Sequence, residues 1–287
     1  MAIRRLPSGY LVNILLYLFV AFSAMGAAHE SNEKPVAVPK DLRAFPHVLC
    51  VGLQWEPAPG SMGYEVQRAP TPFGQFKTLR NNLPQIPLYD DFIGDVATNF
   101  YRVRSMQTNN EGHTLPSDWS QPVEGVSGAM NQQQLLTDVQ RASFDYFYSY
   151  AHPVSGLARA SARRDPDVCA IGASGMGLFN LGVGIDRGFI TRQEGDDQTL
   201  KELRFLSEKA EQFHGAFPHF INGRTGEVIP CGKYDDGADI VETAFLMEGV
   251  LFVREYFSGT NDEETEIRSL ADSLWRGTEW DWFVNQT

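Results

Sequence analysis

The sequence predicts a multidomain β + α protein in which a β-sandwich is followed by an all-α region. Between residues 35 and 126, short runs of alternating apolar and polar residues are separated by clusters of Pro, Gly and Asn, a pattern typical of strands joined by turns. From residue 131 to residue 287, apolar residues recur instead at every third or fourth position, as they do on one face of a helix. A linker at residues 124–128 separates the two patterns.

The N-terminus has the three regions of a secretory signal peptide. Arg4 and Arg5 precede a largely apolar run at residues 11–20, and small residues follow up to Ala28. An uncleaved membrane anchor is the alternative, but about ten apolar residues are half of the ~20 that a spanning helix needs. No cysteine lies in the cleavage zone, where a lipid would be attached. We therefore expect a signal peptide at residues 1–28, a periplasmic or secreted protein, and no stable membrane anchor after cleavage.

Three segments of the first region have the features of sandwich strands. They lie at residues 48–55, 63–68 and 99–104, and several strands at this spacing within about 90 residues predict a β-sandwich. The region resembles a fibronectin type III domain, with Trp55 on the strand that carries a buried tryptophan and Tyr101 on a later, tyrosine-bearing strand. Both side chains are expected in the core. A different immunoglobulin-like sandwich is the alternative.

The second region contains five predicted helices and one hairpin. Thr191, followed three residues later by Glu194, is predicted to cap the third helix. The glycine-rich segment at residues 172–177 lacks the preceding strand that dinucleotide binding requires, so we interpret it as a site of close helix packing. The hairpin is predicted at residues 217–228. The helices are predicted at about residues 135–148, 171–184, 191–213, 238–256 and 261–283.

Charge and cysteine content limit the classes of function. The formal net charge of −12 would repel nucleic acid and anionic lipid surfaces, whereas neutral polymers such as glucans are compatible with it. The three cysteines, Cys50, Cys169 and Cys231, have neither Cys-x-x-Cys nor Cys/His zinc spacing, so we expect no metal site and no cofactor. Cys169 and Cys231 could form a disulfide in an oxidising compartment or stay as thiols, and the sequence does not decide between these states.

The most distinctive motif is a set of three carboxylates just before an apolar run. Asp235, Asp239 and Glu242 are spaced by four and three residues, which would place them on one face at the start of a helix. Like charges so close repel one another unless a polyol, water or cation uses them, and glycosidases employ such a set, with one carboxyl protonated and another ionised. Asp235 or Asp236 could equally be a helix cap. Two interpretations therefore stand, a sugar-active site and a capped, solvated helix start.

Residues 135–283 resemble the glycoamylase-like domain of Bacteroidota proteins, the group that contains glycoside hydrolase family 144, the endo-β-1,2-glucanases. A fibronectin-like domain ahead of such a domain also fits this group. The resemblance is carried by residues 156–159, 170–178, 186–192, 214–220, 235–246 and 280–283.

The resemblance implies an (α/α)6 toroid that hydrolyses β-1,2-glucan or a related glucoside with inversion at the anomeric carbon. It places Asp235, Asp239 and Glu242 in the active cleft as the catalytic carboxylates, without distinguishing their roles. Three further residues become expected substrate contacts, although the first could instead stack on neighbouring aromatic rings and the last could lie in the core. They are His219, Tyr234 and Trp282.

The toroid contains six pairs of helices, and the five helices predicted after residue 130 amount to about half of it. The resemblance therefore implies that residues 131–287 are the N-terminal part of a C-terminally truncated catalytic domain, in which case this chain could be inactive by itself. Two other functions stay open. One is a non-catalytic carbohydrate-binding or interaction protein, and the other is a glycoside phosphorylase or transglycosylase on the same scaffold.

Overall fold

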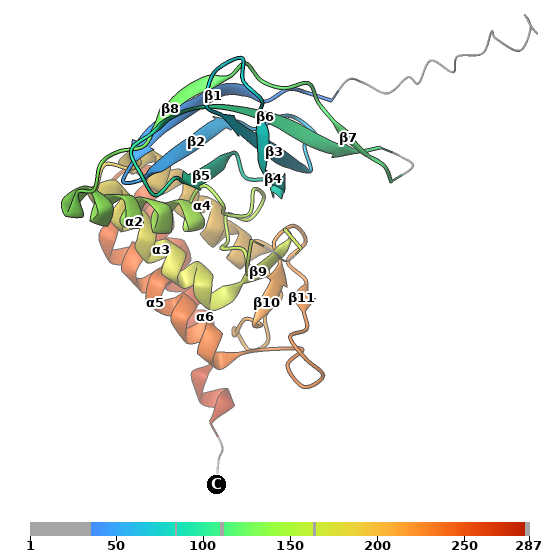
Figure 1. Cartoon of the computed structure of the whole chain (residues 1–287). Coiled ribbons are helices and arrows are strands. Elements are labelled where there is room, and N and C mark those ends of the chain that lie inside the picture. The colour runs from blue at the N-terminus through green and yellow to red at the C-terminus, as the bar shows by residue number, and fades with distance from the viewer. Residues whose placement is uncertain (1–35, 84, 110–111, 163–164, 285–287) are drawn as a thin grey trace, which may run out of the picture. The chain divides into compact units, whose positions relative to one another are not determined.

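The computed structural model describes residues 36–83, 85–109, 112–162 and 165–284 (Figure 1). Within these ranges a β-region, from β1 (Lys40–His47) to β8 (Val123–Val126), precedes a mainly helical region, from α2 (Gln132–Phe147) to α6 (Asp262–Gly277). This order confirms the predicted β + α class. The predicted signal peptide lies outside the described residues. None of the helices in the described ranges is both long and apolar enough to cross a bilayer.

The strands of the first region form two antiparallel sheets. They are β1 (Lys40–His47), β2 (Cys50–Glu56), β3 (Gly63–Ala69), β4 (Lys77–Leu83), β5 (Leu88–Phe92), β6 (Thr98–Thr108), β7 (Thr114–Pro116) and β8 (Val123–Val126). One sheet has the order β1-β2-β5, and the other has the order β4-β3-β6-β7, with β8 also paired to β6. The three strands predicted from sequence correspond to β2, β3 and β6.

Aromatic side chains fill the core of the sandwich. The rings of Trp55 and Tyr64 meet edge to face, with their centroids 5.0 Å apart. Tyr101 is fully buried, and its hydroxyl donates a hydrogen bond to Asp91 at 3.0 Å. The hydroxyl gives each tyrosine a polar end that still finds a partner, since Tyr64 accepts from the backbone N–H of Ala58. The prediction that Trp55 and Tyr101 are core residues is confirmed.

All five predicted helices are present. They are α2 (Gln132–Phe147), α3 (Ile171–Asp186), α4 (Arg192–Glu208), α5 (Ile240–Tyr256) and α6 (Asp262–Gly277), followed by the short 3-10 helix η1 (Trp280–Phe283). At the start of α4, Thr191 and Glu194 form the predicted capping box. The side-chain oxygen of each accepts a hydrogen bond from the backbone N–H of the other, which satisfies two N–H groups that the first turn leaves without helical partners.

Two helices end earlier than predicted because the residues that follow them form hydrogen bonds with other parts of the chain and do not continue the helix. Helix α4 ends at Glu208, and the N–H of Glu211 donates instead to the carbonyl of Gly226 in the hairpin, at 2.9 Å. Helix α6 is followed by an extended Thr278, whose hydroxyl donates to the carbonyl of Gly215 at 3.1 Å. The predicted bounds at residues 213 and 283 were therefore wrong.

Helices α3 and α5 pack with their backbones in contact. A Cβ added at Gly175 would lie 2.1 Å from the carbonyl oxygen of Phe245, and one at Gly249 would lie 2.2 Å from the carbonyl oxygen of Gly175. Both distances are far too short for any side chain, so only glycine permits this approach. The interpretation of the glycine-rich segment as a packing site is confirmed.

A small sheet lies next to the start of α3 (Figure 1). Its strands are β9 (Val168–Ala170), β10 (Phe220–Asn222) and β11 (Val228–Ile229), in the order β11-β10-β9. Strands β10 and β11 are the predicted hairpin, whereas β9 was not predicted. Ala170 at the end of β9 leads directly into α3, so the sheet fixes the start of that helix relative to the hairpin.

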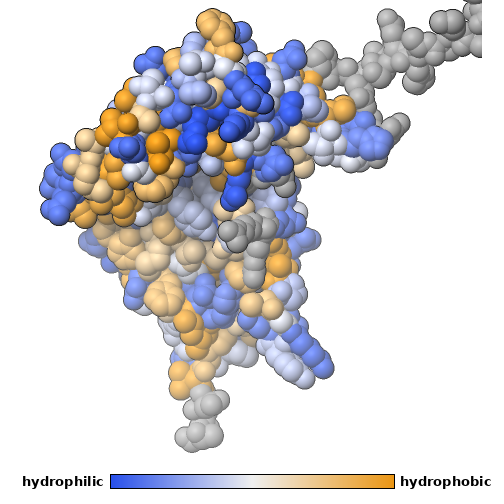
Figure 2. Space-filling view, in the orientation of Figure 1, coloured by the Kyte–Doolittle hydropathy of each residue, from blue (hydrophilic) through white to orange (hydrophobic). Residues whose placement is uncertain are grey.

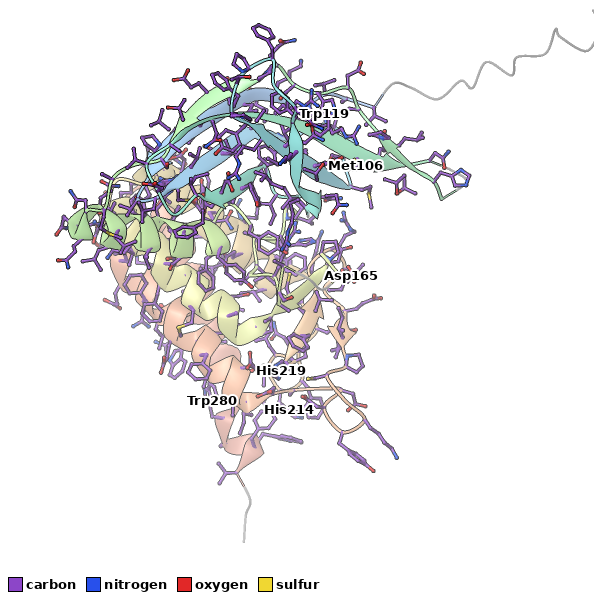
Figure 3. The ribbon with its side chains drawn as sticks, viewed as in Figure 1. Met106, Trp119, Asp165, His214, His219 and Trp280 are labelled. Atoms are coloured by element: carbon purple, nitrogen blue, oxygen red, sulfur yellow. The ribbon has the colours of Figure 1, made fainter. Side chains whose placement is uncertain are left out.

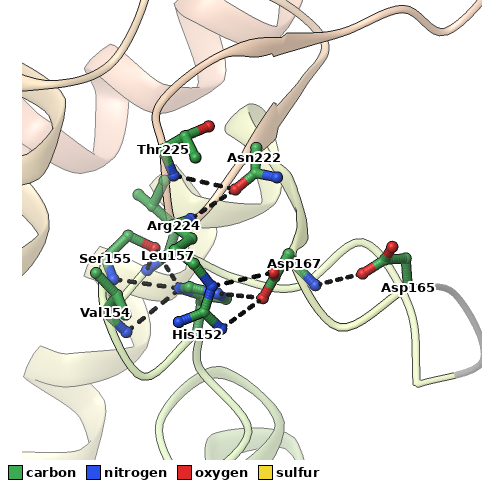
Figure 4. A network of polar contacts seen from close by, with 9 residues as sticks. All are labelled: His152, Val154, Ser155, Leu157, Asp165, Asp167, Asn222, Arg224 and Thr225. Atoms are coloured by element: carbon green, nitrogen blue, oxygen red, sulfur yellow. Dashed lines mark hydrogen bonds and ion pairs between the residues drawn. The ribbon is translucent and has the colours of Figure 1, made fainter. Parts of the chain in front are cut away.

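A buried histidine ties the segment before β9 to the hairpin (Figure 4). His152 Nε2 lies 3.0 Å from Asp167 Oδ1, and Arg224 donates to both oxygens of the same carboxylate at 3.1 and 3.2 Å. The backbone N–H groups of Val154 and Ser155 point at His152 Nδ1, each at 3.3 Å. Burial lowers the pKa of His152, so the neutral ring with its proton on Nε2 satisfies every contact.

Candidate functional site

The structure separates the three predicted carboxylates into a loop residue and two residues at a helix start. Helix α5 begins at Ile240, so Asp235 lies in the loop between β11 and α5, and Asp239 is the N-cap. Asp239 has an extended backbone, and its Oδ1 accepts from the N–H groups of Val241 and Glu242 at 2.9 and 3.0 Å. The expectation that all three project from one helix face was wrong, because the capping hydrogen bonds start the helix at residue 240.

His219, which directly precedes β10, lies within 4 Å of all three carboxylates. Its Nδ1 lies 3.1 Å from Asp239 Oδ2 and 3.8 Å from Asp235 Oδ2. Its Nε2 lies 3.9 Å from Glu242 Oε1. Figure 3 labels His219 and His214 toward the end of the helical region where the C-terminus lies. We call these four residues, Asp235, Asp239, Glu242 and His219, the carboxylate cluster.

Glu242 is oriented by the start of a second helix. Its Oε2 accepts the backbone N–H of Gly172, in the first turn of α3, at 2.8 Å. The N-terminal end of a helix favours an anion, because its first N–H groups point outward without helical partners. A Cβ at Gly172 would lie 2.7 Å from Glu242 Oε2, so a glycine is needed for this contact. The other oxygen of Glu242 is left facing His219.

The carboxylate cluster is accessible to a ligand and able to exchange protons. The side chains of Asp235, Asp239 and Glu242 are 42%, 21% and 20% exposed, so solvent reaches all three. Carboxylate and imidazole groups are the usual acids and bases of enzymes, and here each carboxylate lies 3.1 to 3.9 Å from a ring nitrogen of His219. The cluster can therefore bind a hydroxyl, polarise a water molecule, or transfer a proton.

The two predicted aromatic contacts lie at the surface. Tyr234 is 88% exposed in the loop that carries Asp235. Trp282 is 52% exposed, which excludes a core position, and its ring stacks on His214 with centroids 4.2 Å apart and planes at 15°. Their role as substrate contacts stays a prediction.

Sequence reasoning did not identify the pair formed by His214 and Trp282. His214 Nδ1 lies 2.7 Å from Glu279 Oε2, and Phe213 meets the ring of Trp282 edge to face at 5.0 Å. The available sequence signal was local, the glycine at position 215 directly after His214. In the structure Gly215 and His214 both have positive φ angles, of 73° and 52°.

Two sets of potential metal ligands share His219. One consists of His219, Cys231 and Asp235, and the other of His219, Asp239 and Glu242. Within each set, one ligand atom from each residue lies within 4.8 Å of the others. The residues of the first set are too far apart in sequence to form a recognisable zinc motif, which is why the spacing rules did not find them.

Comparison with known proteins gives relatives of one kind. No family model matches the sequence. The chain is 44% identical over 203 residues to the exo-β-1,2-glucooligosaccharide sophorohydrolase (non-reducing end) of Parabacteroides distasonis, an alignment that covers 70% of this chain and 27% of the relative. This relative is a glycoside hydrolase.

Solved structures agree with the sequence comparison. A β-1,2-glucanase from Parabacteroides distasonis matches with a TM-score of 0.76 and 37% identity, over 88% of this chain and 35% of that chain. The endo-β-1,2-glucanase from Chitinophaga pinensis, solved with sophorotriose and glucose, matches with a TM-score of 0.53 and 40% identity, over 55% of this chain and 40% of that chain. The chain thus spans less than half the length of each of these relatives. It is homologous to β-1,2-glucan hydrolases, as the resemblance in the helical region implied.

Proposed function

We propose that this chain forms part of a glycoside hydrolase that acts on a β-glucan, with β-1,2-glucan as the preferred substrate. The observation that carries the proposal is the carboxylate cluster, in which His219 joins Asp235, Asp239 and Glu242 within a sequence 44% identical to a sophorohydrolase. The net charge of −12 is compatible with a neutral glucan. Because the chain covers 27% of that relative, the proposal concerns the part of the active site that these residues form.

Within the cluster, two carboxylates are held in place and one is not. Asp239 and Glu242 each accept backbone N–H groups through one oxygen, and the second oxygen of each faces His219, where a ligand could also bind it. We propose that these two serve as the ionised members that bind a sugar hydroxyl or activate water. Asp235, in the loop, has the larger exposed fraction and is the member that can approach a bound substrate. An inverting reaction needs a base on the water and an acid on the leaving oxygen.

We propose that α2 to α6 are part of an (α/α)6 toroid. Two helices present exposed apolar residues at helical spacing, Met176 and Val183 on α3, and Val241 and Phe245 on α5. Figure 2 shows hydrophobic residues at the surface over the helical region. Contiguous apolar surface of this kind is typical of faces that other elements cover. The exposed residues of α2 that fit the same interpretation are Leu135, Leu136 and Val139.

We also propose that the protein is exported to the periplasm or secreted. The support is the sequence of residues 1–28, with its basic, apolar and small-residue regions.

One observation favours carbohydrate binding without catalysis as a second function. The exposed ring of Trp282, stacked on His214, is a flat aromatic surface of the kind that packs against a sugar ring. Such a surface would bind a glucan even if the carboxylate cluster carried out no reaction.

Release of reducing ends from β-1,2-glucan tests the proposal. We would compare the wild-type chain, and the longer protein if the gene continues, with Glu242→Gln and Asp239→Asn. Loss of at least 100-fold in rate is expected for both variants, with Glu255→Gln as the control. Glu255 lies on the same helix but is 75% exposed and pairs with Arg254.

The outcomes separate the functions. Undiminished release by Glu242→Gln would show that the cluster is not catalytic. Binding of the glucan without release, weakened by Trp282→Ala, would support the non-catalytic function. A requirement for phosphate would identify a phosphorylase, and products longer than the substrate would identify a transglycosylase.

A further inference from the structure

The loop before α5 brings a thiol next to the carboxylate cluster. Cys231 is exposed, and its sulfur lies within 4.8 Å of a ligand atom of His219 and of Asp235. His219, directly before β10, supplies a nitrogen donor. Cys231 and Asp235, in the loop between β11 and α5, supply a sulfur and an oxygen donor. Nothing in the proposed hydrolysis uses the thiol, so this donor set needs its own explanation.

We propose that His219, Cys231 and Asp235 bind a zinc ion at the edge of the carboxylate cluster. Imidazole, thiolate and carboxylate are the ligands that zinc takes in proteins, whereas calcium and magnesium take oxygen ligands and have no use for sulfur. Ligand atoms about 2.0–2.3 Å from a tetrahedral zinc are about 3.3–3.8 Å apart. A nitrogen and an oxygen ligand belong at the short end of this range, and His219 Nδ1 and Asp235 Oδ2 are 3.8 Å apart, so this pair would close by about 0.4 Å on binding.

The other set of ligands that includes His219 suits zinc less well. Asp239 and Glu242 each use one oxygen to accept backbone N–H groups, and together with His219 they offer no sulfur. Their positions are fixed by the ends of α5 and α3, whereas Asp235 and Cys231 lie in the loop between β11 and α5. Asp239 Oδ2 now lies 3.1 Å from His219 Nδ1 and would lose this hydrogen bond when Nδ1 binds the ion, so it could then approach the ion or support a water in the fourth position.

Zinc at this position would inhibit the reaction. It would occupy His219 and Asp235, both members of the carboxylate cluster, and would neutralise the charge that binds a sugar hydroxyl. This consequence rests on the proposed hydrolytic function, but binding of the ion does not. The affinity is expected to fall at low pH, because the thiol and the imidazole must lose their protons before they bind.

Calorimetric titration of the chelator-treated chain with zinc chloride tests binding. We expect one zinc per chain, and at least a tenfold loss of affinity in Cys231→Ser. Cys50→Ser, on β2 of the sandwich, is the matched control and should bind as the wild type does. Asp235→Asn is a second variant with an expected loss of affinity, and it preserves the thiol. Absence of zinc binding, or equal affinity in Cys231→Ser and the wild type, would overturn the proposal.

Cobalt(II) in place of zinc identifies the ligand atom directly. A cobalt–thiolate bond gives a charge-transfer absorption in the near ultraviolet, which we expect in the wild type and in Cys50→Ser but not in Cys231→Ser. A cobalt complex of the wild type without this absorption would refute ligation by Cys231.

Hydrolysis assays with and without zinc distinguish the two proposals. Zinc binding with no hydrolysis under any condition would remove the proposed function and leave the metal site standing. Hydrolysis with no zinc binding would overturn the metal site and leave the proposed function standing. If both hold, zinc should lower the rate in the wild type and much less in Cys231→Ser at the same zinc concentration.

Discussion

Glu242 on α5 accepts a hydrogen bond from the backbone N–H of Gly172 on α3, at 2.8 Å. The two residues are 70 positions apart in the chain, and they meet because glycines let the backbones of α3 and α5 touch. The orientation of a candidate catalytic carboxylate therefore depends on how two helices pack. Substitutions at two different glycines of α3 test this packing.

Gly175→Ala should destabilise the protein by about 2–3 kcal/mol, because a Cβ there would lie 2.1 Å from a backbone oxygen of α5 and would force the helices apart. Gly177→Ala is the matched control on the same helix. Its Cβ would meet the ring of Phe147 at 3.4 Å, an ordinary contact, so the better helix propensity of alanine should stabilise by about 0.5–1 kcal/mol. Urea unfolding of both variants measures the difference, and equal effects would contradict close packing at Gly175.

The capping and chemical roles of Asp239 can be separated by two substitutions. Asp239→Ala removes the acceptor for the N–H groups of Val241 and Glu242 and should cost about 1 kcal/mol of the free energy of unfolding. Asp239→Asn should cost much less, because asparagine caps a helix about as well as aspartate. Both variants lose the charge beside His219, so both should lose hydrolysis. Equal stability of the two variants in urea would show that the cap contributes little.

The ion pair between Arg192 and Glu264 should contribute more to the free energy of unfolding than the partly exposed position of Arg192 suggests. Arg192 donates to both oxygens of Glu264 at 2.8 and 3.0 Å, and Glu264 is only 3% exposed. Arg192→Met leaves a buried carboxylate without its cation and should cost about 2–3 kcal/mol, somewhat below the usual range because the arginine is itself partly exposed.

The control for this pair is a second bidentate pair at the surface. Arg204 donates to both oxygens of Glu266 at 2.7 Å, and both side chains are exposed. Arg204→Met should therefore change the free energy of unfolding by less than about 1 kcal/mol. Thermal or urea unfolding measures both variants. A larger loss in Arg204→Met than in Arg192→Met would contradict the role assigned to burial.

Asp196→Asn should stabilise the protein as the pH rises above about 4, with the full gain above about pH 6. Burial, and then the nearby charge of Glu264, raise the pKa of Asp196 from 3.8 to about 6, so ionisation is less favourable in the folded state. The cost is absent below pH 3.8, grows as the pH rises towards 6, and is complete above it. At pH 8 the variant should gain about 1–3 kcal/mol, and at pH 4 almost nothing. Asp197→Asn, at an exposed neighbouring position on the same helix, is the matched control, and urea unfolding of both variants at pH 4 and pH 8 measures the difference.

Periodicity predicted the elements well because it reports which face of each element is buried. The alternating pattern around Trp55 and Tyr101 predicted strands and core positions, and the three-to-four spacing after residue 130 predicted each helix. Where bounds were wrong, as at Glu208, a hydrogen bond to a distant part of the chain replaced the next helical bond. Patterns within one segment carry no information about such partners.

In the candidate site, too, local sequence determined some features and tertiary contacts determined the others. The sequence alone determined that Asp235, Asp239 and Glu242 form one acidic motif at a helix start, because local spacing decides which residues are neighbours. Only the tertiary structure decided that Asp239 is the cap, that Asp235 lies in the loop, and that Glu242 binds the start of α3. It also brought His219 among them and Cys231 beside them, because the pairing of strands and the packing of helices place distant residues within a few ångströms of one another.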